Sequence, residues 1–175
     1  MSDIPEQNEI HTDDAPTAST ATEPSQDAHE GRHRRQRIVV GVDGSASSLG
    51  AFRAAIRMAR STDSDLLAIA AWKYPSAYGG YPPPDWSPES DVREVLADAT
   101  ASVFEGDVPA WFTSDVREGA PVRVLLEASH GASMLIVGSR GHGGFSGLLL
   151  GSVSSTCAEY AKCPVLVHHE PPESE

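Results

Sequence analysis

The chain reads MLIVGSRGHGGFSGLLLGS from Met134 to Ser152. Its first four residues form an uninterrupted apolar run, which is typical of a strand that is covered on both faces. Glycines then follow at positions 138, 141, 143, 144, 147 and 151. Glycine permits positive φ angles and a close approach of the backbone to a ligand, so that successive N–H groups can turn inward around an anion. This stretch predicts a buried strand that leads into an anion-binding loop.

The residues after the loop favour the same interpretation. Ser152, Ser154 and Ser155 begin a segment predicted to be helical over 152–162, and a helix N-terminus attracts negative charge through its free N–H groups. Arg140 and His142 add side chains that can face an anion. The loop is no Walker loop, because GxxxxGK[ST] is absent, and residues 141–146 lack the third glycine of GxGxxG.

Further apolar runs and helical patterns alternate along the rest of the chain. The predicted strands are 37–42, 65–71, 111–118, 134–138 and 165–168. Leu49, Phe52, Ile56 and Ala59 recur at helical spacing after a capping serine, Ser45 or Ser47. Further helices are predicted from Pro88 to Gly106, after Pro121 and over 152–162. This order predicts an α/β fold, with an open, doubly wound, five-stranded, largely parallel sheet flanked by four helices.

A second polar feature follows the first predicted strand. The chain runs Gly41-Val-Asp43-Gly-Ser45 there, which places a carboxylate at the mouth of a strand. Ligands of open α/β sheets lie beyond the carboxyl ends of the strands, so Asp43 and the glycine loop are expected to share one site. The alternative role for Asp43 is that of a turn or helix-capping carboxylate.

Composition divides the chain into three parts. Residues 1–36 hold eight acidic and three basic side chains and only isolated large aliphatics, and we predict that they form a disordered acidic tail. Residues 37–169 form the predicted domain, and 170–175 a short acidic C-terminal tail. Residues 73–88 are rich in Tyr and Pro, which predicts a long loop that could cover a ligand. No secretory signal or membrane span is recognisable, so a cytoplasmic location is expected.

Three segments resemble the universal stress proteins. Gly138-Ser-Arg-Gly141, nine residues and Gly151-Ser152 match the G-x2-G-x9-G-[S/T] motif of the ATP-binding members of that family. Residues 38–45 resemble the family's opening strand, and 164–167 resemble its closing one. The resemblance covers residues 37 to about 169 and implies a Rossmann-like fold similar to that of the adenine nucleotide alpha hydrolases. It departs from the family at Ser133, where an acidic residue is common, and in the long loop at 73–88.

The resemblance implies a dimeric stress-response sensor or regulator that binds ATP, or AMP or ADP, with Mg²⁺ held at Asp43 if a metal is present. The implied cofactor-binding residues are Gly41, Asp43, Ala71, Gly138, Ser139, Arg140, Gly141, Gly151, Ser152, Val153 and Ser154. No catalytic residues are assigned, because nothing arranges Arg140, His142 and Asp43 as a catalytic set. At most weak ATP hydrolysis is expected.

Alternative functions remain open at this point. A slow ATPase or nucleotide-processing enzyme of the same fold would share these residues, and a structural dimer that binds no nucleotide would have lost the glycine motif. A phospho-accepting receiver domain needs an aspartate beyond its third strand and a lysine at its fifth. Here Asp115 lies within the predicted third strand, and His168 and His169 end the fifth.

The net charge and the last predicted strand indicate which binding partners the protein has. A net charge of −12 disfavours nucleic acid as a partner. The basic cluster Arg32, Arg34, Arg35 and Arg37 is interpreted as a solvated boundary.

The spacing of Cys157 and Cys163 fits no zinc or redox motif, and His168 and His169 lack nearby residues that could complete a metal site. Residues 165–168 are predicted to form an apolar edge strand that pairs with a second copy as a homodimer.

Overall fold

The computed structural model describes residues 35–74, 86–141 and 149–169. The chain separates into two units, Met1–His33 and Arg34–Glu175, and the fold below is that of the second unit. Apart from residues 35 and 36, the predicted acidic tail lies outside the described residues, as do 170–175, most of the loop at 73–88 and His142 with Gly143, Gly144 and Gly147. The predicted domain boundaries therefore stay predictions.

The described part of the second unit is an α/β fold whose sheet has five strands in the order β3-β2-β1-β4-β5. The strands are β1 (Arg37–Gly41), β2 (Asp65–Trp72), β3 (Phe112–Glu118), β4 (Met134–Gly138) and β5 (Val165–His168). The helices are α1 (Ala46–Thr62), α2 (Pro88–Phe104), α3 (Pro121–Ala128) and α4 (Ser152–Tyr160). Every neighbouring pair of strands is parallel, which confirms the predicted fold class.

The predicted helix starts agree with the structure. The Ser45 hydroxyl caps α1 by accepting a hydrogen bond from the backbone N–H of Ser48 at 3.2 Å. Ser87 caps α2 in the same way, and Pro88 and Pro121 occupy first-turn positions, where a missing N–H costs nothing. The last helix ends at Tyr160, two residues earlier than predicted, because Ala161 already has an extended backbone. No helix in the described ranges is both long enough and apolar enough to cross a membrane.

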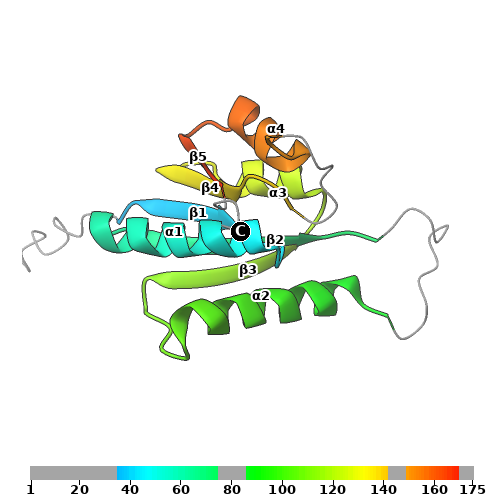
Figure 1. Cartoon of the computed structure of the whole chain (residues 1–175), viewed down its shortest axis with the longest axis horizontal. Coiled ribbons are helices and arrows are strands. Elements are labelled where there is room, and N and C mark those ends of the chain that lie inside the picture. The colour runs from blue at the N-terminus through cyan, green and yellow to red at the C-terminus, as the bar shows by residue number, and fades with distance from the viewer. Residues whose placement is uncertain (1–34, 75–85, 142–148, 170–175) are drawn as a thin grey trace, which may run out of the picture. The chain divides into compact units, whose positions relative to one another are not determined.

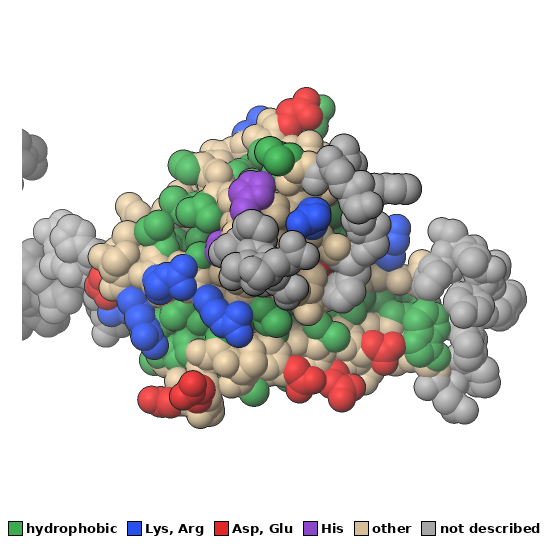
Figure 2. Space-filling view, viewed as in Figure 1, with side chains coloured by type: hydrophobic (Ala, Val, Ile, Leu, Met, Phe, Trp, Pro, Cys, Tyr) green, Lys and Arg blue, Asp and Glu red, His purple; other side chains and the backbone are tan. Residues whose placement is uncertain are grey.

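The sheet is covered on both faces (Figure 1). On one face α1 and α2 pack over a cluster of rings in which Phe52 lies 5.6 Å from Phe112 and 6.1 Å from Phe104, measured between centroids. On the other face α3 and α4 pack over a smaller aliphatic cluster that contains Val39 and Leu135. Arg and Lys side chains lie over α1 on the face that Figure 2 presents, and Asp and Glu side chains follow α2.

The order of the strands fixes where a ligand can enter. β1 lies in the middle, between β2 and β4, with Val39 opposite both Leu67 and Leu135. The chain leaves β1 through α1 on one face and leaves β4 toward α4 on the other. These diverging connections open a crevice beyond the carboxyl ends of β1 and β4, the usual ligand position in such sheets.

The Cys157 thiol provides a test of this packing. Cys157 lies on the buried side of α4, and burial raises the pKa of its thiol from 9.0 to about 11, whereas Cys163 is half-buried. Because only thiolates alkylate readily, we expect iodoacetamide at about pH 8 to modify Cys163 alone in the native protein and both cysteines in guanidinium chloride. Mass spectrometry of tryptic peptides would distinguish them. Native alkylation of Cys157 would contradict the packing of α4.

The same thiol makes stability depend on pH. The unfolded thiol ionises near pH 9 while the folded one keeps its proton to about pH 11, so its contribution to stability is intact below pH 9 and is lost as the pH rises through 11. Two pKa units correspond to about 3 kcal/mol. The free energy of unfolding of Cys157→Ala should therefore fall less between pH 8 and pH 11 than that of the unsubstituted protein.

Candidate functional site

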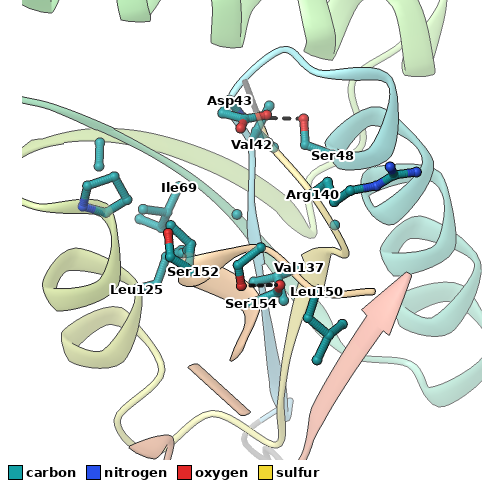
Figure 3. A pocket seen from close by; sticks show the side chains of 17 residues that line it. Val42, Asp43, Ser48, Ile69, Leu125, Val137, Arg140, Leu150, Ser152 and Ser154 are labelled. Carbon is teal, nitrogen blue, oxygen red and sulfur yellow. Dashed lines mark hydrogen bonds between the residues drawn. The ribbon is translucent and has the colours of Figure 1, made fainter. Parts of the chain in front are cut away.

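A cavity of about 480 Å³ lies at the carboxyl ends of β1 and β4. Ten of the eleven residues that the sequence singles out line it, together with residues that the sequence did not indicate. These ten are Gly41, Asp43, Ala71, Gly138, Arg140, Gly141, Gly151, Ser152, Val153 and Ser154. In Figure 3 Asp43 and Arg140 lie toward one side of the cavity, Ile69, Leu125 and Ser152 lie together toward the other, and Ser154 lies lower in the middle.

Ser139 is the one predicted site residue that does not line the cavity. It is 3% exposed, and its N–H donates to the carbonyl of His168 at 2.8 Å. Its own carbonyl accepts hydrogen bonds from the N–H of Gly151 at 2.7 Å and from the Ser154 hydroxyl at 2.9 Å. Ser139 therefore holds the two ends of the glycine loop together from below.

The turn after β1 holds Asp43 at the rim. The N–H of Val42 still bonds to the carbonyl of Ile69 in β2 at 2.9 Å, and the chain then turns through Gly44, which has a φ of 84°. The Oδ1 atom of Asp43 accepts hydrogen bonds from the N–H of Ser45 at 3.0 Å and from the Ser45 hydroxyl at 2.6 Å. Asp43 is thus an exposed carboxylate with a fixed direction, and part of its bonding supports the turn, as its alternative role predicted.

The opposite rim is the N-terminus of α4. Its cap residue is Gly151, which has no side chain to satisfy the first N–H groups of the helix. The hydroxyl of Ser154 donates instead to the carbonyls of Ser139 and Gly151, so its hydrogen does not point at the cavity. Ser152 is exposed, and Arg140 is the one cationic side chain among the described residues that line the cavity. The free N–H groups of this rim can receive an anion, and Arg140 adds a positive charge from the side of Asp43.

Three described glycines of the loop, Gly138, Gly141 and Gly151, act through their missing side chains. None of the three has the positive φ that glycine permits. A Cβ on Gly138 would lie 2.8 Å from the backbone carbonyl carbon of Ser47, and one on Gly141 would press on Oδ2 of Asp43. These glycines let β4 approach α1 and let the loop approach Asp43.

Sequence reasoning missed the apolar wall of the cavity. This wall is formed by Ile69, Pro121, Leu125, Val137 and Leu150. Leu125 reaches the cavity because Gly41 leaves room for it: a Cβ on Gly41 would lie 3.1 Å from both of its methyl carbons. Ile69, Leu125 and Val137 fit ordinary core patterns, and Pro121 reads as a helix start, so residue type alone does not show that they face a cavity. The remaining unpredicted lining residues are Val42 and Ser48.

The described lining of the cavity contains few side chains that could bind a metal ion by themselves. Within the described ranges no group of three His, Cys, Asp or Glu side chains could hold one. Asp43 is the only acidic side chain among the lining residues in those ranges. A cation at this rim would need oxygen atoms from a ligand as well.

The known proteins that this chain resembles belong to one family. The family model described as "Universal stress protein family" matches residues 34–169. A universal stress protein of Mycobacterium tuberculosis is 37% identical over 134 residues, which are 76% of this chain and 45% of that relative. One from Mycolicibacterium smegmatis is 36% identical over 133 residues, covering 74% of this chain and 44% of that protein. The chain thus spans about half the length of these curated relatives.

Solved structures agree with the fold. The universal stress protein UspA from Lactobacillus plantarum superposes with a TM-score of 0.62 at 18% identity, covering 77% of this chain and 98% of that one. A universal stress protein in complex with cAMP superposes with a TM-score of 0.59 at 28% identity, covering 79% of this chain and 99% of that one.

Proposed function

Because this chain belongs to the universal stress protein family, we propose that its cavity binds an adenine nucleotide and that the protein is a sensor or regulator in a stress response. The observation that carries the proposal is the division of the cavity. Part of the lining is apolar, formed by residues such as Ile69 and Leu125, and another part is polar, with Arg140 and the first residues of α4. A purine suits the apolar part of the lining, and a phosphate suits the polar part.

Two further observations support a nucleotide. The cavity volume of about 480 Å³ falls within the range of small-molecule sites. The relative solved with cAMP carries an adenine nucleotide, and its chain aligns with most of this one. We propose ATP, ADP or AMP as the ligand, with the adenine toward Ala71 and the phosphates toward Gly141 and Ser152.

Asp43 is the residue that would meet a magnesium ion. Magnesium is usually held by one or two carboxylates together with phosphate oxygens and water, and Asp43 contributes one carboxylate next to Gly141. One carboxylate is enough to hold Mg²⁺ only together with the phosphate oxygens of a bound nucleotide. Without the nucleotide there would be no Mg²⁺ site.

We propose binding with little or no turnover. Hydrolysis of a phosphoanhydride needs an oriented water and cationic stabilisation of the transferred group. The described lining provides one arginine, and the Asp43 carboxylate is bonded to Ser45. A protein of this kind would work where adenine nucleotides are abundant, which is the cytoplasm.

The homodimer that the sequence suggests remains a proposal. β5 lies at one edge of the five-stranded sheet and pairs with β4 on one side only. Its four residues are half-buried in the described chain, so pairing with a second copy would cover more of them. Multi-angle light scattering at micromolar concentration should give twice the chain mass, and a monomer there would contradict the proposal.

The central test is identification of the ligand. The purified protein is precipitated with acid, the supernatant is analysed by mass spectrometry, and the protein is titrated in parallel with fluorescent ATP, with and without Mg²⁺. We expect an adenine nucleotide in at least one arm. Release of phosphate is measured in the same samples, and sustained turnover would favour the enzyme alternative. If no adenine nucleotide co-purifies or binds, the proposal fails.

The single positive charge of Arg140 should strengthen the binding of ATP modestly. We expect Arg140→Gln to weaken ATP binding about fivefold, because one exposed charge-assisted contact contributes about 1 kcal/mol. The loss should shrink as NaCl is raised, since salt screens the interaction. Arg123→Gln is the matched control, because Arg123 is exposed on α3 and does not line the cavity. Equal affinities of the two variants would place the phosphates elsewhere.

A further inference from the structure

The outer face of α1 carries three arginines and no acid. Arg53, Arg57 and Arg60 are spaced four and three residues apart, so they share one side of the helix, and all three are exposed. The seventeen residues of α1 include no Asp or Glu. Within the described ranges none of the three arginines forms an ion pair, although Arg60 lies over the Trp111 ring at 5.9 Å from its centroid. We call this surface the arginine face.

The outer side of α2 has the opposite charge. Asp91, Glu94 and Asp98 are all exposed and share one side of that helix. The only basic residue of α2, Arg93, is already bonded to Glu89 one turn earlier. We call the side formed by Asp91, Glu94 and Asp98 the acidic face.

The two faces lie next to each other on the same side of the sheet. α1 and α2 contribute to one core cluster and contact each other. Figure 2 shows Arg and Lys side chains gathered over α1 and Asp and Glu side chains along α2. Both helices return from strands that run in the same direction, so α1 and α2 are themselves roughly parallel.

A pair of adjacent parallel stripes of opposite charge is complementary to itself. When a second copy is turned about a two-fold axis that runs along the helices, its acidic face meets the arginine face of the first copy. The reverse contact forms at the same time, as closed two-fold symmetry requires. We propose that α1 and α2 form such a self-complementary docking surface for a second copy of this chain, separate from the β5 edge.

Other partners fit this surface less well. A nucleic acid or an anionic membrane would be attracted by the arginine face but repelled by the adjoining acidic face and by the net charge of −12. A second copy presents both charges in the required order. Matching of opposite charges in this way sets the choice of partner and the register of the contact.

The size of the surface predicts a weak contact. Each helix has 17 residues and is thus about 25 Å long, so two neighbouring helices present roughly 500 Å² per copy. A stable interface buries about 800 Å² per partner. The pairing should therefore appear only at high protein concentration and low salt. Because β5 lies at the opposite end of the sheet order from β3, which packs against α2, both contacts could form at once.

A charge swap tests the proposal. One variant carries Arg53→Glu and Arg57→Glu, and the other carries Glu94→Lys and Asp98→Lys. Each variant alone places like charges opposite each other in a homotypic pair, whereas a mixture restores opposite charges in both contacts. Sedimentation velocity is run at about 20 mM and about 500 mM NaCl, where the Debye length falls from roughly 20 Å to roughly 4 Å.

We expect the mass-average size of the unsubstituted protein at about 100 µM to rise to about twice its high-salt value or more when the salt is lowered, because a dimer formed through β5 would carry two such surfaces. Each variant alone should keep its high-salt size, and the equimolar mixture should regain the larger one. Unchanged thermal unfolding midpoints would show that both variants fold. The proposal is overturned if the size of the unsubstituted protein does not respond to salt, if either variant alone still associates, or if the mixture does not. Capture of a short DNA duplex in place of self-association would overturn it too.

Discussion

Gly141→Val should lower the affinity for an adenine nucleotide about fiftyfold or more while leaving the sheet folded. A Cβ at this position presses on Oδ2 of Asp43, so the carboxylate has to leave its place at the rim and the two branches of valine enter the cavity mouth. Loss of one charged contact together with the close approach of the loop corresponds to about 2–3 kcal/mol. Titration with fluorescent ATP would measure the change.

Ser155→Ala is the matched control for this experiment. Ser155 is exposed on α4 close to the loop but does not line the cavity, so its substitution should leave the affinity unchanged. Circular dichroism and the thermal unfolding midpoint would confirm that Gly141→Val is folded. Retention of full affinity by a folded Gly141→Val protein would mean that the nucleotide does not approach Asp43 and Gly141.

Gly138→Ala should destabilise the fold itself. The added Cβ would lie 2.7 Å from the Ser47 hydroxyl oxygen, 2.8 Å from the Ser47 carbonyl carbon and 2.9 Å from the Ser47 carbonyl oxygen. Two of these atoms belong to the backbone of α1, which cannot turn aside as a side chain can. Overpacking of this kind costs about 2 kcal/mol, which should lower the unfolding midpoint of a domain of this size by about 8 °C. Differential scanning calorimetry would measure it.

Gly151→Ala serves as the comparison for stability. Its Cβ would meet the Ser139 carbonyl at 3.4 Å and the Arg140 Cα at 3.6 Å, which are close to ordinary contact distances. Its φ of −77° is available to alanine. The midpoint of Gly151→Ala should therefore fall much less than that of Gly138→Ala. Similar losses for the two variants would show that the approach of β4 to Ser47 does not determine stability here.

The fold could be predicted because local signals and the global arrangement agree. Continuous apolar runs such as 134–138 occur where strands are covered on both faces, and Ser45, Ser87 and Pro121 mark helix starts that the structure confirms. The alternation of strands and helices then leaves few topologies. The ends of elements were less predictable, as α4 shows, because the backbone at Ala161 is set by its neighbours and by the turn into β5.

The polar half of the candidate site could also be predicted, but not its apolar half. Asp43 and the glycine motif can be recognised from residue type and spacing. Ile69 and Leu125 resemble any core residues, and only the packing of α3 under Gly41 places Leu125 at the cavity. The same limit applies to Gly138, whose missing side chain leaves room for Ser47. A sequence shows that a side chain is missing, but not which neighbour occupies the space.

The central position of β1 has a consequence for how the protein is made. β1 is synthesised before the other four strands of its sheet, yet it needs β4, whose residues begin about a hundred positions later, to complete its second ladder. Contacts between such distant segments form slowly, and an unpaired central strand is prone to aggregation. Nascent chains should therefore stay sensitive to chaperones and proteases until residues 134–168 have emerged. Asp43 and Gly141 would meet only at that stage, so the proposed nucleotide could stabilise this domain only after β4 has been synthesised.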